Sequence, residues 1–146
     1  MKQLKGKKIG IFGLGISGIS CFEFLKPSAK EIICWDDKDT NKLDKKFMIP
    51  LSEPNWYGLD VIIISPGVPK SHHIFALAFK YNIPISSDIE IFLANNPKAK
   101  IIAITGTNGK STTTALIHHI ISNNNMEYYM GGNIGMPVLS LPQNKD

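Results

Sequence analysis

Short apolar runs alternate with helical patterns along most of the chain. Mainly apolar runs predict strands at 8–12, 31–35, 60–65 and 84–86. Helices are expected at about 17–25, 72–81 and 88–94. Residues 37–59 are polar and irregular, with one short strand expected near Met48. Because the strands are apolar throughout rather than at alternate positions, they indicate an α/β fold whose parallel sheet is covered on both faces.

A second unit begins after Asn95-Asn96-Pro97-Lys98, a polar stretch with a proline that indicates a boundary. Its expected elements are a strand at 100–105, a glycine turn, a helix at 110–122 and a short strand at 127–130. We therefore divide the chain into a first domain at 1–96 and a second segment at 97–146. The second segment holds too little sheet for a domain of its own, so we interpret it as the opening of a longer domain.

The composition is that of a soluble globular protein, with 146 residues of which 43% are apolar and 19% charged. The longest aliphatic run, Val61 to Ile64, is far shorter than the roughly 20 residues that cross a bilayer. The N-terminus has no apolar signal core, so a cytoplasmic protein without a membrane span is expected. Cys21 and Cys34 lie in apolar runs and are expected to be buried thiols without a chemical role.

The charge pattern gives no sign of a nucleic-acid partner. The net charge is +4, and all 16 basic residues are lysine. Arginine, whose guanidinium fork makes the commonest specific base contact, does not occur. The lysines are scattered rather than gathered in a stripe. We therefore expect small-molecule partners and a monomer.

The first candidate site is a glycine turn between a predicted strand and a predicted helix. Gly13, Gly15 and Gly18 match the pattern G-x-G-x-x-G, in which a tight turn brings the free N–H groups of a helix N-terminus to an anion. Asp36 ends the next strand, where an acidic residue commonly binds a ribose hydroxyl. The same glycines could serve strand–helix packing alone. The motif does not distinguish NAD from a uridine nucleotide.

Other polar positions carry less information. The turn Ser65-Pro66-Gly67-Val68-Pro69 follows the third strand at the edge where α/β folds bind ligands, but an ordinary exit turn would look the same. Asp88 and Glu90 are best explained as acidic residues in the first turn of a helix. The four histidines are expected at helix ends or on the surface rather than as metal ligands.

A second glycine turn, Gly106-Thr107-Asn108-Gly109-Lys110-Ser111-Thr112, again joins a strand pattern to a helix pattern. Gly-Lys-Ser at a helix start is typical of a phosphate loop. Its backbone N–H groups surround the phosphates, its lysine neutralises the β and γ oxygens, and its hydroxyl binds magnesium. Only Thr107 and Asn108 separate Gly106 from Gly109, so the loop is shorter than the common form.

Together these motifs resemble the Mur ligase family, whose phosphate loop has this shortened form. Further segments resemble the family in the same order along the chain: Gly13–Gly18, Trp35-Asp36-Asp37, Ser65–Val68, Ser87–Glu90 and Gly131–Gly135. The resemblance covers essentially the whole chain. It implies a Rossmann-like first domain that binds the UDP part of a substrate rather than NAD.

The resemblance also implies individual contacts. Uridine diphosphate would be bound by Gly15, Ile16, Ser17, Asp36, Asp37 and Gly67. Asn133 would contact the muramoyl part of the substrate, and Lys38 stands where some relatives have arginine. ATP would be bound by Gly106, Thr107, Asn108, Gly109, Lys110, Ser111 and Thr112. Of these, Lys110 would be catalytic and Ser111 would bind magnesium.

The implied activity is an ATP-dependent ligase with Mg²⁺ that adds D-glutamate to UDP-N-acetylmuramoyl-L-alanine through an acyl phosphate, in peptidoglycan precursor synthesis. The family's later magnesium ligands, its modified lysine and its D-glutamate-binding domain have no counterpart up to Asp146, so this chain is expected to be inactive alone. Two alternatives stay open. One is an NAD-dependent oxidoreductase, which leaves the second glycine turn unexplained. The other is a non-catalytic nucleotide-binding module.

Overall fold

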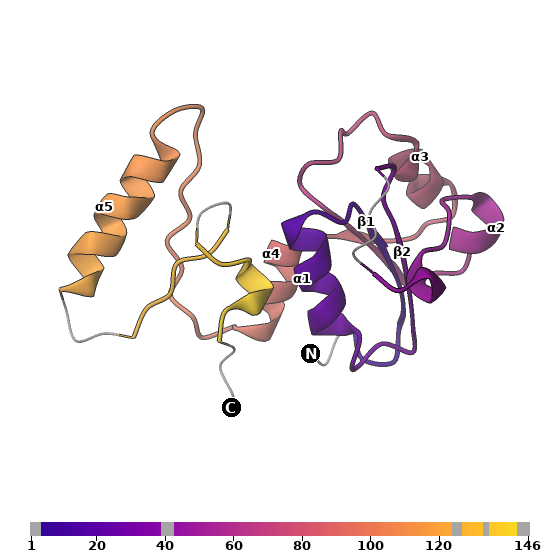
Figure 1. The fold of residues 1–146 in the computed structure, drawn as a ribbon, viewed down its shortest axis with the longest axis horizontal. Coiled ribbons are helices and arrows are strands. Elements are labelled where there is room, and N and C mark those ends of the chain that lie inside the picture. Colours follow the sequence, from indigo (N-terminus) through magenta and orange to yellow (C-terminus); the bar gives the residue numbers. More distant parts are fainter. Residues whose placement is uncertain (1–3, 39–42, 124–126, 133–134, 143–146) are drawn as a thin grey trace.

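The computed structural model describes residues 4–38, 43–123, 127–132 and 135–142. One parallel sheet has the strand order β2-β1-β3-β4, with helices on both faces (Figure 1). Its strands are β1 (Lys8–Phe12), β2 (Glu31–Trp35), β3 (Val61–Ile64) and β4 (Ile85–Ser86). The helices are α1 (Ile16–Leu25), α2 (Glu53–Trp56), α3 (His73–Lys80), α4 (Asp88–Asn95) and α5 (Lys110–Ser122), with 3-10 turns η1 (Lys45–Phe47) and η2 (Val138–Ser140). The predicted α/β class and parallel sheet are confirmed.

Successive side chains along each strand point to opposite faces of the sheet, and this divides the core into two layers. Ile9 and Ile11 of β1 point to one face and pack with α1 and α4, while Phe12 points to the other. The second layer contains Trp56 at the end of α2 and Ile74 of α3. Both faces of the central strands are therefore buried, which explains why these strands are apolar at every position.

Gly10 of β1 allows α2 to lie close against the sheet. A Cβ at this position would stand 2.8 Å from the Trp56 ring and 2.7 Å from Leu59. The Trp56 side chain is fully buried, and its indole N–H donates to the Ile49 carbonyl at 3.3 Å. Glycine at the strand centre thus provides room for the largest side chain of the core.

The second segment differs from its sequence prediction. Helix α5 has the predicted bounds, but the described residues at 100–105 and 127–130 form no strand. Ile101 and Ile102 are 48% and 62% exposed. Strand structure requires a hydrogen-bonded neighbour, and among the described residues none lies beside 100–105. Both strand predictions are therefore wrong for this structure.

One part of the second segment packs onto the first domain. In η2, Val138 and Leu139 are buried in the core layer beneath α1 and α4. The hydroxyls of Ser20 and Ser140 lie 3.0 Å apart. Helix α5 has no buried residue and stands apart from the sheet (Figure 1). The division at residue 96 stays a prediction.

The predicted burial of both cysteines is confirmed. Cys21 and Cys34 are free thiols buried in the same layer. Burial raises the pKa of each thiol to about 12, so both are protonated at neutral pH. Within the described part of the chain, no helix is long and apolar enough to cross a membrane.

Candidate nucleotide-binding site

The loops that follow β1, β2 and β3 meet at the carboxyl edge of the sheet. The chain runs from β1 outward to β2 and then returns to β3 on the opposite side of β1, so β1 and β3 form the topological switch point. Open α/β sheets bind ligands at such a point. Backbone hydrogen bonds hold the loops to the neighbouring strand ends, since the Gly13 N–H donates to the Trp35 carbonyl of β2 and the Ser65 N–H donates to the Phe12 carbonyl of β1.

The three glycines of the first turn have different surroundings. Gly13 has φ +89°, and a Cβ on Gly18 would stand 1.9 Å from the Gly13 carbonyl oxygen. Gly13 is therefore required for its left-handed backbone conformation, and Gly18 is required because no Cβ fits beside the Gly13 carbonyl. Gly15 has nothing within 4 Å of its Cβ position and precedes α1 without a side-chain cap. The open space at Gly15 and the uncapped N–H groups of α1 together form a place for an anion.

Ser65 connects the third strand to the glycine turn. Its hydroxyl donates to the Gly13 carbonyl oxygen at 2.6 Å. This bond fixes the turn at the switch point, a role that the sequence pattern alone does not reveal. Gly67, two residues on, is exposed with open space around it. The loop after β3 therefore supports the turn through Ser65 and presents backbone to solvent at Gly67.

Asp36 contacts the glycine turn directly. One carboxylate oxygen accepts from the Leu14 N–H, and the other accepts from the Lys38 N–H at 2.9 Å. The carboxylate therefore holds the end of β2 against the loop after β1. From the sequence we expected this residue to bind a ligand hydroxyl, and the structure adds a bracing role that the pattern did not predict.

Asp37 lies beside the start of α3. Its Oδ2 is 2.8 Å from Nε2 of His72. The Nδ1 atom of the same ring accepts from the Ile74 N–H at 3.2 Å and so caps α3. The histidine was predicted at a helix end, and the structure confirms that placement. Its bond to Asp37 was not predicted, because the two residues are distant in sequence.

Ile16 and Ser17, two further residues predicted to contact UDP, lie at the first turn of α1. The Ile16 side chain is 76% exposed. A depression of about 400 Å³ lies beside them, lined by Gly15, Ile16, Ile19, Ser20, Glu23, Pro137 and Ser140. Asn133, the remaining predicted contact, lies outside the described residues.

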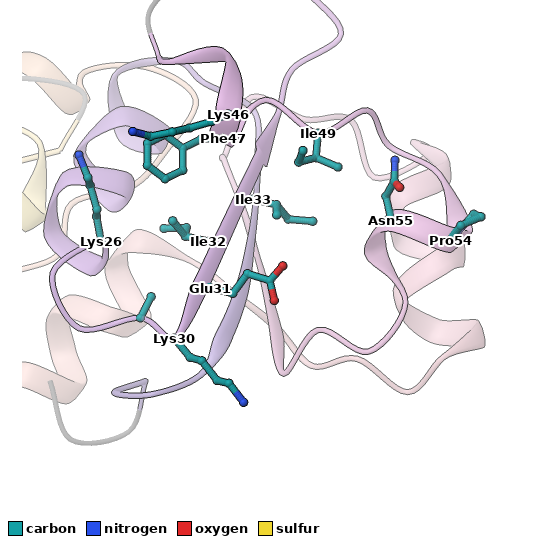
Figure 2. Close-up of a pocket in the computed structure, with 11 residues that line it drawn as sticks. Lys26, Lys30, Glu31, Ile32, Ile33, Lys46, Phe47, Ile49, Pro54 and Asn55 are labelled. Carbon is teal, nitrogen blue, oxygen red and sulfur yellow. The ribbon is translucent and has the colours of Figure 1, made fainter.

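A larger cavity of about 670 Å³ lies along the outer edge of β2 (Figure 2). Its lining includes Ile32 and Ile33 of the strand, together with Phe47, and the ammonium groups of Lys26 and Lys46 lie 5.3 and 5.1 Å from the centroid of the Phe47 ring. This cavity is separate from the three loops at the carboxyl edge. None of the predicted site residues lines it.

The second glycine turn forms a loop at the start of α5. Gly109 is the N-cap residue with φ +76°, and no side chain caps the helix. The Lys110 ammonium folds back over the loop and donates to the Gly106 and Thr107 carbonyls. Asn108, Ser111 and Thr112 are exposed. The free N–H groups and the lysine are of the right kind to receive phosphate oxygens.

Magnesium would have few protein ligands at this loop. Within the described residues, no three His, Cys, Asp or Glu side chains lie close enough together to hold a metal. The Ser111 hydroxyl offers one oxygen. Mg²⁺ in nucleotide sites takes many of its ligands from phosphates and water, so a single hydroxyl is compatible with a metal that arrives with a nucleotide.

The parallel sheet, its strand order and the loops at its carboxyl edge define a Rossmann-like α/β domain. A family model described as "Mur ligase MurD-like, N-terminal domain" matches residues 7–87. The chain therefore belongs to the MurD-like family of Mur ligase N-terminal domains.

Curated relatives extend the similarity along the whole chain. The UDP-N-acetylmuramoylalanine–D-glutamate ligase of Rickettsia bellii is 46% identical over 97% of this chain, and that of Rickettsia prowazekii is 47% identical over 95%. Each match covers 32% of the relative, so the chain spans about a third of their length. Among solved structures, UDP-N-acetylmuramate-alanine ligase MurC from Thermotoga maritima matches with TM-score 0.49 and 28% identity, over 80% of this chain and 29% of that one.

Proposed function

We propose that the chain supplies the UDP-binding domain and the phosphate loop of an ATP-dependent ligase that adds D-glutamate to UDP-N-acetylmuramoyl-L-alanine. The observation that carries this proposal is the presence of two different glycine loops in one chain, each at an uncapped helix N-terminus. Relatives named for this reaction match across both loops. The proposed enzyme acts in the cytoplasm as a monomer.

The first loop would receive the uridine diphosphate. The N–H groups at the start of α1 face open space at Gly15, which suits a diphosphate. Asp37 would accept a hydrogen bond from the nucleoside, and Gly67 would let the loop backbone approach it. Asp36 would act mainly through the loop that it holds. Ile16 and Ser17 would line the path of the diphosphate along α1.

The second loop would hold ATP and its magnesium. Lys110 would leave its carbonyl partners and pair with the β and γ phosphate oxygens, a stronger bond because both groups are charged. Gly109 and the N–H groups of α5 would bind the same oxygens, and Ser111 would contribute its hydroxyl to magnesium. ATP supplies the phosphoryl group that activates the alanyl carboxylate toward the D-glutamate amine. Two anions must meet for this step, so the lysine has an electrostatic task.

A binding titration tests the proposal. The purified 146-residue chain is titrated with UDP-N-acetylmuramoyl-L-alanine, with UDP and with NADH under one set of conditions. We expect both uridine compounds to bind more tightly than NADH. Equal or tighter binding of NADH would contradict the proposal and favour the oxidoreductase. Absence of uridine binding would contradict it as well.

A further inference from the structure

We propose that His72 is a positioning residue that fixes the Asp37 carboxylate for the uridine nucleotide, an inference that rests on the proposed function. The imidazole connects two of the loops at the carboxyl edge. Its Nε2 atom lies 2.8 Å from Asp37 Oδ2, after β2, while its Nδ1 atom caps α3. No similarity or motif pointed to this residue.

The cap determines which nitrogen carries the proton. Nδ1 accepts a hydrogen bond from the Ile74 N–H with its lone pair, so this nitrogen carries no proton. A neutral imidazole has one donor and one acceptor, and Nε2 is therefore the donor. The Nε2–H bond points at Asp37 and accounts for the 2.8 Å separation. The helix start thus sets the tautomer, and the tautomer orients the carboxylate.

The ring itself is held in place. Its centroid lies 4.6 Å from that of Phe12 at the end of β1 and 4.3 Å from that of His73. The His72 side chain is 16% exposed, whereas that of Asp37 is 56% exposed. A half-buried ring with two ring contacts and two hydrogen bonds is a fixed support. The exposed carboxylate is the part of the pair that faces solvent and could meet a ligand.

The two neighbouring aspartates differ in what remains available. Both oxygens of Asp36 already accept from backbone N–H groups of the loops. Asp37 uses Oδ2 for His72, and among the described residues its Oδ1 has no hydrogen-bond partner. A free carboxylate oxygen accepts from a ribose hydroxyl or from the imide N–H of uracil. The contact with His72 therefore leaves the second carboxylate oxygen of Asp37 available to a ligand.

Substitution can separate the cap from the contact with Asp37. Asparagine is among the best N-cap residues, and its side chain is too short to reproduce the Nε2 contact. In His72→Asn, we expect the melting temperature to stay within about 2 °C of the parent value. UDP affinity should fall about three- to tenfold, the scale of one intramolecular hydrogen bond. His72→Ala should lose the cap as well, lowering the melting temperature by about 3–5 °C.

A double substitution shows whether His72 acts through Asp37. Asp37→Ala alone should weaken UDP binding about tenfold or more, because a charged acceptor is lost. Adding His72→Asn to Asp37→Ala should cause no further loss of affinity. If His72→Asn bound UDP as tightly as the parent, the proposal would be overturned, and His72 would serve only as the N-cap of α3. The same would follow if the two losses multiplied in the double variant, since His72 would then act independently of Asp37.

NMR of the free chain separates this inference from the proposed function. Three-bond couplings report the χ1 rotamer of Asp37 without any nucleotide. We expect one dominant rotamer in the parent and averaged couplings in His72→Asn. Equally fixed couplings in both proteins would overturn the positioning role. If the parent bound no uridine compound, the proposed function would fail, while these couplings would still decide whether His72 orients Asp37.

Discussion

At the residue scale, the glycine turn illustrates how one motif combines different physical requirements. The sequence pattern marks Gly13, Gly15 and Gly18 alike. In the structure, Gly18 allows contact with the Gly13 carbonyl, whereas the Cβ position of Gly15 faces open space. The motif could be recognised from sequence, but the separate roles could not, because they depend on the spacing between a strand end and a helix.

This difference predicts opposite outcomes for two alanine substitutions. Gly18→Ala places a methyl group against a backbone carbonyl that cannot rotate away. We expect destabilisation at the upper end of the about 1–3 kcal/mol typical of overpacking, measured by urea unfolding.

Gly15→Ala is the matched control. The residue has φ −68°, which alanine adopts readily, and nothing crowds its Cβ position. Its stability should stay at or slightly above the parent value. UDP affinity should fall about tenfold, since the methyl group occupies the space proposed for the diphosphate and a clash costs about 1–3 kcal/mol. Unchanged UDP binding would show that the nucleotide does not approach this turn.

Asp36 provides a second prediction at this scale. Asp36→Ala removes the acceptor for the Leu14 N–H. We expect a loss of about 1–3 kcal/mol in unfolding free energy and UDP binding weaker by about ten- to a hundredfold. Thermal unfolding measures the loss of stability, and titration calorimetry measures the loss of UDP affinity. A variant that is destabilised but binds UDP normally would mean that the loop is not part of the site.

Asp60 offers a matched control at the opposite end of the sheet. Its carboxylate accepts from the Lys8 N–H at 2.7 Å, so Asp60→Ala should lower stability and leave UDP affinity unchanged. The Lys8 N–H, with the nearby Lys7 ammonium, lowers the pKa of Asp60. The stabilisation of the fold by the ionised Asp60 carboxylate is therefore fully present above the ordinary Asp pKa of about 4. It is lost as the pH falls through the lowered pKa of Asp60 in the folded chain. As the pH is lowered, the unfolding free energy should therefore fall less steeply in Asp60→Ala than in the parent chain.

At the element scale, periodicity and caps predicted most of the first domain. The capping box of Ser87 and Glu90 explains why α4 begins at Asp88, as the acidic first turn suggested. The pattern at 100–105 did not produce a strand. A local sequence pattern favours an extended backbone, but it does not provide the neighbouring strand with which that backbone must pair. The packing of η2 onto α1 could not be predicted, since a short turn near residue 138 has no periodic signal.

The η2 contact predicts unequal effects for two leucines of the second segment. Leu139 is buried beneath α1 and α4, and Leu139→Ala should lower stability by about 2–5 kcal/mol. Leu116 of α5 is 59% exposed, and Leu116→Ala should change stability by less than about 0.5 kcal/mol. Urea unfolding followed by tryptophan fluorescence measures both. Equal effects would show that η2 does not form part of the first domain's core.

At the scale of the whole molecule, the two glycine loops differ in how complete their surroundings are. The first lies on a four-stranded sheet and is held by two neighbouring loops, through Asp36 and Ser65. The second is exposed along its length, and its helix contributes no buried residue. Sequence motifs identified both loops equally well. They could not reveal this difference, because the surroundings of a loop come from elements that are distant in sequence.

This contrast predicts that the chain does not catalyse ligation alone. Phosphoryl transfer needs a closed metal shell, a positioned nucleophile and exclusion of water, and Lys110 and Ser111 supply only part of these. The test incubates the 146-residue chain with UDP-N-acetylmuramoyl-L-alanine, D-glutamate, Mg²⁺ and ATP. We expect no substrate-dependent phosphate release. Release that disappears in Lys110→Ala would contradict this prediction.

The central claim is that the carboxyl edge of the sheet binds a uridine nucleotide, and amide shift mapping tests it most directly. UDP is added to the ¹⁵N-labelled chain, with NADH added to a parallel sample. The largest shifts with UDP should fall at 13–17, 36–38 and 65–68, with smaller shifts at the same positions for NADH. The claim would be contradicted if the largest UDP shifts lay along the outer edge of β2, around Lys26 and Phe47, or if those three loops did not respond.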